Sequence, residues 1–125
     1  MQLLYVFIGG GLGAALRHVV NLASLRLVGT GLPWGTFFIN VTGSILMGMV
    51  AGLFAWKVSL PPALRLLLAT GILGGYTTFS TFSLETALLL ERGQTWQAIG
   101  YVLASVLLGV TGLFAGMAAV RALAA

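Results

Sequence analysis

The sequence has no cysteine, no aspartate and a single histidine, His18, and it has few charged residues of either sign. Without cysteine the chain cannot form disulfides, use a thiol in catalysis or bind a metal through thiolates. One histidine excludes a site built from several histidines of the same chain. Six Lys or Arg and two Glu residues make up only 6% of the 125 residues, whereas soluble domains carry about 25% charged residues. These side chains are too few to cover a surface in water, so the composition predicts a membrane protein.

Apolar residues fill most of the chain: 59% of residues are hydrophobic, and the mean hydropathy is +1.08. A helix needs about 20 mostly apolar residues to cross a bilayer. Turns rich in glycine, proline and polar residues at 29–33, 59–62 and 91–94 divide the chain into four such stretches. The sequence therefore predicts an all-α fold: a single transmembrane domain over residues 1–125, with transmembrane helices at about residues 3–25, 36–56, 64–90 and 97–121.

The basic residues give the chain a net charge of +4, but they are too widely spaced to indicate a nucleic-acid partner, and nothing indicates a different protein as partner. The side of a membrane with more Lys and Arg near the helix ends tends to stay in the cytoplasm. Here the two sides are nearly equal, with Lys57, Arg65 and Arg121 on one and Arg26, Arg92 and the borderline Arg17 on the other. This balance predicts dual topology, in which the chain inserts in both orientations and an inverted pair assembles. A fixed orientation set by one loop is the alternative.

Glycine is abundant, with 18 residues, and pairs of glycines four positions apart occur in every predicted span. Such pairs let helix backbones approach closely, and in lipid this packing is a main source of helix association. The spacing therefore predicts close contacts between helices or between subunits.

Polar residues within the predicted spans are costly unless they find partners, so they are candidates for functional roles. Thr36 and Asn40 are four positions apart and lie on one face of the second span, and Tyr101 and Ser105 have the same spacing in the fourth. Asn40 has two interpretations. It either makes a hydrogen bond between helices or lines a pore with its amide group.

The third span contains the most unusual stretch of the chain, from Gly74 to Ser83. Two adjacent glycines followed by β-branched threonines make a poor helix, and we expect the third helix to break between Gly74 and Thr78, in the middle of the membrane. Irregular backbone at this depth is tolerated where it is buried in protein or lines a cavity. Its freed carbonyl groups can coordinate a hard cation such as Na⁺.

Two phenylalanines, Phe79 and Phe82, follow the expected break and are three positions apart on one helical face. Hydroxyl groups surround the same turn, on Ser80, Thr81 and Ser83. The edge of an aromatic ring is positive, so two rings presented edge-on can favour an anion, and the hydroxyls and the Asn40 amide add hydrogen-bond donors. The alternative is that both phenylalanines only pack in the membrane.

Taken together, these motifs resemble the CrcB/Fluc family of fluoride channels, over nearly the whole chain. The first span carries Gly10-x-x-Gly13-Ala14-x-x-Arg17, and the second carries Gly35-Thr36-x-x-x-Asn40-x-x-Gly43-Ser44. The most specific match is the string Gly74-Gly75-Tyr76-Thr77-Thr78-Phe79-Ser80-Thr81-Phe82-Ser83-x-Glu85. His18 departs from the family, which more often has an aromatic residue after the arginine.

The resemblance implies an antiparallel, dual-topology homodimer in the bacterial inner membrane, a passive channel and not an enzyme, which exports fluoride from the cytoplasm. It implies that the fluoride pore is lined by Thr36, Asn40, Phe79, Ser80, Thr81, Phe82, Tyr101 and Ser105. Arg17 would lie near a vestibule, and Glu85 near the mouth of the pore. The family also holds a structural Na⁺ at the dimer centre, a role that transfers here to the main-chain carbonyls of Gly74 and Thr77.

Three other classes of protein share this composition. A small multidrug-type exporter also has four helices, but it needs a glutamate in its first span, where this chain has Arg17 and no acidic residue. An intramembrane hydrolase would pair a serine with His18, but no aspartate is available to complete the site. A structural subunit of a larger complex would use its polar residues only to hold helices together.

Overall fold

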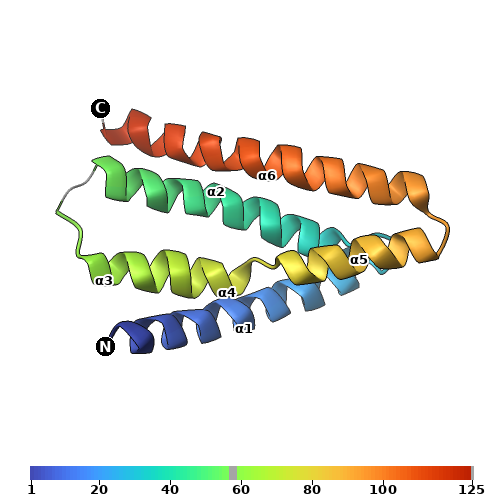
Figure 1. Cartoon of the computed structure of the whole chain (residues 1–125), viewed down its shortest axis with the longest axis horizontal. Helices are drawn as coiled ribbons and strands as arrows, with labels where there is room; N and C mark the ends of the chain where they lie inside the picture. Colours follow the sequence, from blue (N-terminus) through green and yellow to red (C-terminus); the bar gives the residue numbers. More distant parts are fainter. Residues whose placement is uncertain (57–58, 125) are drawn as a thin grey trace.

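In a computed structural model, which describes residues 1–56 and 59–124, the chain forms a bundle of helices (Figure 1). Lys57, which entered the comparison of charges above, lies outside the described residues. The start of α1 (Gln2–Val28), the end of α2 (Trp34–Trp56), the start of α3 (Pro62–Arg65) and the end of α6 (Thr95–Ala124) lie at one end of the bundle, and the loops at 29–33 and 92–94 lie at the opposite end. The described part of the chain contains no β-strand. Its four longest helices are α1 (Gln2–Val28), α2 (Trp34–Trp56), α5 (Phe79–Glu91) and α6 (Thr95–Ala124).

Between α2 and α5, three short helical segments follow one another without a gap. These are α3 (Pro62–Arg65), the π-helix η1 (Leu66–Leu73) and α4 (Gly74–Tyr76). Proline suits the first position of α3, because the N–H that it lacks would have no partner there. The wider π-helical turns were not predicted from the sequence; such turns often occur at functional sites.

The helical segments before α5 end at Tyr76. Thr77 (φ −80°, ψ 158°) and Thr78 (φ −151°, ψ 117°) are extended, and α5 begins at the next residue. These two threonines lie at the C-terminal end of the stretch in which the sequence predicts a break. Gly74 and Gly75 are themselves helical, so the glycine pair precedes the extended residues and does not form them.

Among the described residues, three helices are long and apolar enough to cross a membrane: α1, α2 and α6. Each covers one of the predicted spans, whereas residues 64–90 are distributed over α3, η1, α4 and α5. Many large apolar side chains of these helices are exposed, including Phe7 and Phe114. Such a surface suits lipid and not water. The fold is therefore that of an all-α membrane protein, as the composition predicts.

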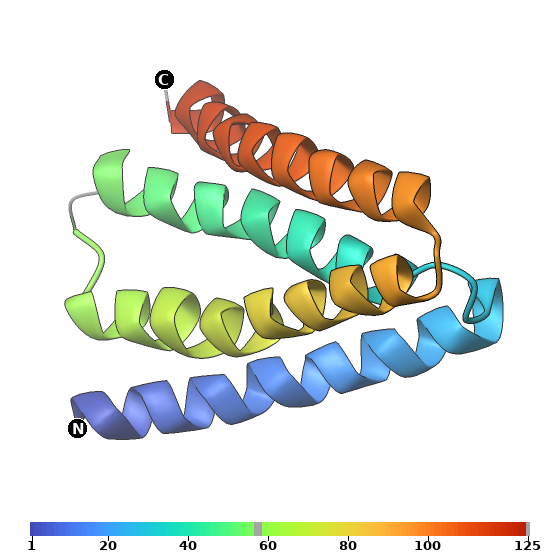
Figure 2. The same ribbon diagram turned by 45° about the vertical axis from the view of Figure 1, so that its right-hand side comes forward.

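The helices pack in two close sets, α2 along α6, and α1 along η1 and α4 (Figure 2). Glycines lie at both contacts. A β-carbon on Gly13 would collide with the carbonyl of Ile72 in η1, and one on Gly48 would collide with the carbonyl of Leu113 in α6. Backbone therefore lies directly against backbone, which is the close packing that the glycine spacing predicts.

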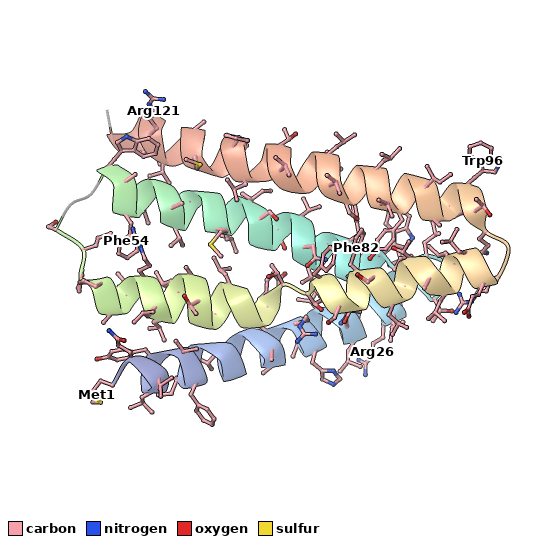
Figure 3. All side chains as sticks on the ribbon, in the orientation of Figure 1. Met1, Arg26, Phe54, Phe82, Trp96 and Arg121 are labelled. Carbon is pink, nitrogen blue, oxygen red and sulfur yellow. The ribbon has the colours of Figure 1, made fainter. Side chains whose placement is uncertain are left out.

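Arginines and aromatic rings meet at the end of the bundle that holds the termini. The Arg65 guanidinium lies 4.8 Å from the centre of the Phe54 ring, and the Arg121 guanidinium lies 5.6 Å from the Trp56 ring. Trp96 lies at the opposite end, near the start of α6 (Figure 3). Arginine and tryptophan favour the boundary between lipid and water, so the two ends of the bundle mark the two faces of the membrane.

Candidate functional site

The extended residues Thr77 and Thr78 form the centre of the candidate site. The Thr78 hydroxyl accepts a hydrogen bond from the Thr81 backbone N–H (3.2 Å) and thereby caps the first turn of α5. The same hydroxyl lies 3.1 Å from the Thr81 hydroxyl and 3.3 Å from the Ser80 hydroxyl. The predicted hydroxyl cluster is thus present, and part of it serves to start the new helix.

Asn40 of α2 makes two hydrogen bonds to the backbone of Thr78. Its amide nitrogen donates to the Thr78 carbonyl (3.0 Å), and its amide oxygen accepts from the Thr78 N–H (2.8 Å). The interhelical hydrogen bond considered from the sequence is therefore present. The amide nitrogen carries a second hydrogen, which these two bonds do not use.

These side-chain bonds free two backbone carbonyls. In a continuous helix, the N–H of Thr78 would donate to the carbonyl of Gly74, and the N–H of Thr81 would donate to that of Thr77. Here the two N–H groups donate to Asn40 and to the Thr78 hydroxyl instead. The carbonyls of Gly74 and Thr77 thus lose their helical partners.

Arg17 of α1 lies beside the same helix end. Its Nε donates to the carbonyl of Gly75 (3.1 Å), another group that the interruption leaves without a helical partner. A cation is favourable at a helix C-terminus because the free carbonyls there are negative. Arg17 is not among the residues that line the two cavities described next.

A cavity of about 300 Å³ lies beside the interruption. Its lining includes four of the predicted pore residues, Asn40, Phe79, Phe82 and Ser105. The centres of the two phenyl rings are 5.7 Å apart, with the ring planes inclined by 44°. Phe79 is 78% exposed in the single chain. The Ser105 hydroxyl is buried and has no hydrogen-bond partner among the described residues.

Phe82 also connects this cavity to the packed part of the bundle. Its ring centre is 5.1 Å from that of Tyr101, and it packs against a buried cluster formed by Leu89, Ala98 and Tyr101. Figure 3 shows Phe82 on the side of α5 that faces α2 and α6. The orientation of this ring is therefore fixed by contacts on several sides.

A larger cavity, of about 410 Å³, brings together the predicted residues Thr36, Thr81 and Glu85. Glu85 accepts a hydrogen bond from the hydroxyl of Tyr101 (3.1 Å). The same cavity is also lined by polar residues that the sequence did not place in the pore, among them His18, Asn21 and Arg92.

A further contact at the interruption was also missed. Thr42 of α2 lies 3.0 Å, hydroxyl to hydroxyl, from Tyr76, the last helical residue before the break. Tyr76 is buried, so its hydroxyl needs a partner. The one available signal was that Thr42 lies two residues after Asn40 in the same polar stretch of α2.

Three long apolar helices, a helical segment interrupted at Thr77 and Thr78, and a cavity lined by rings, an amide and hydroxyls define a multi-pass membrane protein that can hold a small polar solute away from lipid. Comparison with known proteins identifies the family. A family model described as "CrcB-like protein, Camphor Resistance (CrcB)" matches residues 4–117. The chain therefore belongs to the CrcB family, as the motifs predict.

Curated relatives match almost the whole chain. It is 58% identical over 123 residues to the fluoride-specific ion channel FluC of Rhodopseudomonas palustris (strain BisB5), with 98% of this chain and 99% of the relative covered. The fluoride-specific ion channel FluC 2 of Nitrobacter hamburgensis is 56% identical over 121 residues (97% and 98% covered). FluC of Rhizobium meliloti (strain 1021) is 49% identical over 122 residues, with 98% of each chain covered.

These matches establish the class of the protein and its location in the cell. The family is one of ion channels and not of enzymes, which excludes the intramembrane hydrolase considered from the sequence. Together with the three apolar helices, they make the chain a multi-pass integral protein of the bacterial membrane.

Proposed function

We propose that the chain is a fluoride-selective channel through which F⁻ leaves the cytoplasm passively. The observation that carries this proposal is the cavity of about 300 Å³ in which two phenyl rings, the Asn40 amide and the buried Ser105 hydroxyl come together. The near-complete matches to proteins named as fluoride-specific ion channels support the same function.

The chemistry of this cavity suits a small anion. Fluoride is strongly hydrated, so a selective path has to replace its water with several donors at short range. The edges of Phe79 and Phe82, the second amide hydrogen of Asn40 and the hydroxyl of Ser105 can supply them. A larger halide keeps each donor at a longer distance and is therefore stabilised less by it. Several weak sites in succession let an ion both enter and leave.

The path continues from the rings into the larger cavity, past the hydroxyls of Thr36 and Thr81. Ser80 contributes its hydroxyl beside Thr78. The Tyr101 hydroxyl donates to Glu85 and so offsets part of the repulsion between that carboxylate and a passing anion. Arg17 adds positive potential from the helix end next to the path.

The membrane potential supplies the driving force. An inside-negative potential of about 100 mV favours outward movement of an anion by about 2.3 kcal/mol per charge. Glu85, in the wall of the larger cavity near the loops, is the acidic residue closest to the path, so no carboxylate at mid-depth is placed to relay protons. A passive channel therefore suits the chain better than proton-coupled exchange.

Assembly as an antiparallel homodimer would complete the pore. Phe79 is 78% exposed, although it lines the cavity, so a second copy can supply the wall that the single chain leaves open. The near-equal division of Lys and Arg supports insertion in both orientations. Reporters fused to the C-terminus should then be found on both sides of the membrane; reporters on one side only would contradict dual topology.

A structural Na⁺ fits the carbonyls that the interruption frees. The Gly74 and Thr77 carbonyls have lost their helical partners, as described above, and neutral backbone oxygens are ligands that a hard cation prefers. Two such oxygens from each copy would give a four-oxygen site on the dimer axis. The bound ion would offset the partial negative charge of these carbonyl oxygens and hold the two interruptions together, without being transported.

Removal of Na⁺ is therefore expected to destabilise the protein. Exchange of Na⁺ for N-methylglucamine should lower the melting temperature of the purified protein in detergent by about 5 °C, since a ligand bound only to the folded state stabilises it. Exchange of choline for N-methylglucamine is the control and should change nothing. Equal melting temperatures with and without Na⁺ would remove the ion from the proposal.

The function itself is tested by fluoride efflux from liposomes that contain the purified protein. A channel should empty fluoride-loaded vesicles rapidly, without a proton gradient, and leave chloride inside. An exporter that exchanges protons would need the gradient, and a structural subunit would release nothing. Retention of fluoride would overturn the proposed function.

Replacement of Phe82 by isoleucine should slow fluoride efflux by about tenfold, because it removes one ring edge from the path while leaving an apolar side chain in the packing. Phe114 is the matched control, since it is 64% exposed on α6 and lies outside the lining of both cavities. Phe114→Ile should leave efflux unchanged. If both variants conduct like the unaltered protein, the rings do not contact the ion.

A further inference from the structure

The larger cavity opens at the end of the bundle where α1 passes into α2. Its wall includes the last turns of α1, the following loop at 29–33, the start of α2 and one face of α5. Three lining side chains carry charge or can acquire it: His18, Glu85 and Arg92. The fluoride path described above makes no use of His18.

The two permanent charges of this wall have opposite signs. Arg92 is positive, and Glu85, which accepts the hydrogen bond from Tyr101, is negative. A neutral His18 leaves the wall without net charge, whereas a protonated His18 gives it one positive charge. The charge of this cavity is therefore decided by the single histidine of the chain.

Other ionisable groups near His18 do not change this balance. On α1, Arg17 donates to the Gly75 carbonyl, and Arg26 is exposed two turns farther along the helix. On α5, Glu91 is exposed next to Arg92. Arg17, Arg26 and Glu91 are not among the residues that line the cavity.

We propose that this cavity captures fluoride before it reaches the phenyl rings, and that protonation of His18 strengthens the capture. The inference rests on the proposed function. A protonated imidazole, the Asn21 amide and the Arg92 guanidinium are hydrogen-bond donors suited to a small anion. Histidine is the side chain whose charge ordinarily changes between about pH 5 and 8, and His18 lines a cavity whose wall extends to the loop at 29–33.

Thr81 connects this cavity to the rings. It lines the larger cavity, and its hydroxyl bonds to that of Thr78, which lines the smaller one beside Phe79 and Phe82. The Thr78 and Thr81 hydroxyls thus lie between the larger cavity and the ring cavity.

The first test is fluoride efflux from liposomes with equal pH on both sides, corrected for HF leak with protein-free vesicles. Between about pH 8 and pH 6, efflux by the unaltered protein should rise about threefold, the effect of one added charge in a partly hydrated cavity. His18→Gln should lose this rise, and His18→Lys should give efflux that stays high across the range. An equal rise in His18→Gln would overturn the inference.

Two arginine variants distinguish the effect of charge inside the cavity from the effect of charge elsewhere on the surface. Arg92→Gln should lower efflux at both pH values but keep the pH-dependent rise, because His18 is unchanged in this variant. Arg26→Gln removes an equal charge at the same end of the bundle outside the cavity, and it should leave efflux unchanged. If none of the proteins releases fluoride at any pH, the proposed function fails; if they release it without dependence on His18, only the inference fails.

A second test does not depend on transport. Linkage requires that, if protonated His18 binds fluoride better, fluoride makes His18 easier to protonate. The chain has one histidine, so its ring signals in the NMR spectrum of tag-free protein are unambiguous. Fluoride should move the titration midpoint of these signals to higher pH, while an equal concentration of chloride should move it less. A titration midpoint that does not change when fluoride is added would overturn the proposed site.

Discussion

Replacement of Asn40 by aspartate is expected to slow fluoride efflux by about 100-fold or more. The carboxylate places a negative charge in the cavity of about 300 Å³ through which the anion is proposed to pass, and like charges about 4 Å apart repel by about 4 kcal/mol near a protein surface. Aspartate also cannot donate to the Thr78 carbonyl, which now accepts from the Asn40 amide. Efflux from liposomes measures the effect.

A neutral variant separates the charge from the lost hydrogen bonds. Asn40→Leu has the same number of side-chain heavy atoms, branched at the same position, and loses both bonds to Thr78, but it adds no charge. It should conduct less than the unaltered protein and clearly more than Asn40→Asp. If Asn40→Asp conducts within about twofold of the unaltered protein, Asn40 does not line the fluoride path.

A large loss of stability is expected at Gly13. In Gly13→Ala the added β-carbon would meet the carbonyl of Ile72, a backbone group that cannot rotate away as a side chain can. The contact between α1 and η1 would have to open, at a cost of about 3 kcal/mol. Thermal unfolding of the purified protein in detergent, together with the yield of folded protein, measures this loss.

Replacement of Gly11 by alanine should have the opposite effect on stability. Gly11 lies on the same helix two residues away, and a β-carbon there meets nothing within 4 Å. Gly11→Ala should stabilise the protein by up to about 1 kcal/mol, because alanine favours a helix over glycine. A similar loss of stability in both variants would show that glycine is needed along α1 for another reason than contact with η1.

The course of the apolar segments could be predicted from the sequence because it follows from composition alone. Runs of apolar residues separated by turns predict α1, α2 and α6 within a few residues of their observed ends. In residues 64–90, by contrast, the structure is less regular than the single span that the sequence predicts. Its π-helical turns and the helical Gly74 and Gly75 pack against α1, and such tertiary contacts do not appear in local sequence.

The sequence could predict which residues form the candidate site, but not which groups they bond to. Asn40, Phe79, Phe82 and Ser105 stand out as polar or aromatic residues in apolar spans, and the structure places them in one cavity. The partner of Asn40, the Thr78 backbone, is 38 positions away. Backbone groups have no sequence signature.

The same limit applies to the pairing of Arg17 with the Gly75 carbonyl, 58 positions away. The sequence indicates that Arg17 needs a partner in or near the membrane, but any free helix end could provide it. The larger cavity is harder still to predict, because its lining comes from three helices and a loop.

The length of α1 has a consequence for the depth of that cavity. At about 1.5 Å per residue, its 27 residues span about 40 Å, and an ordinary tilt of about 20° shortens this only slightly. The hydrocarbon layer is about 30 Å thick, so roughly the last six residues must project beyond it. The N-terminal turns are apolar, whereas the last turns carry Ser24 and Arg26. The mouth of the cavity therefore sits among the lipid headgroups and stays wet even where the bilayer thickens by a few ångströms.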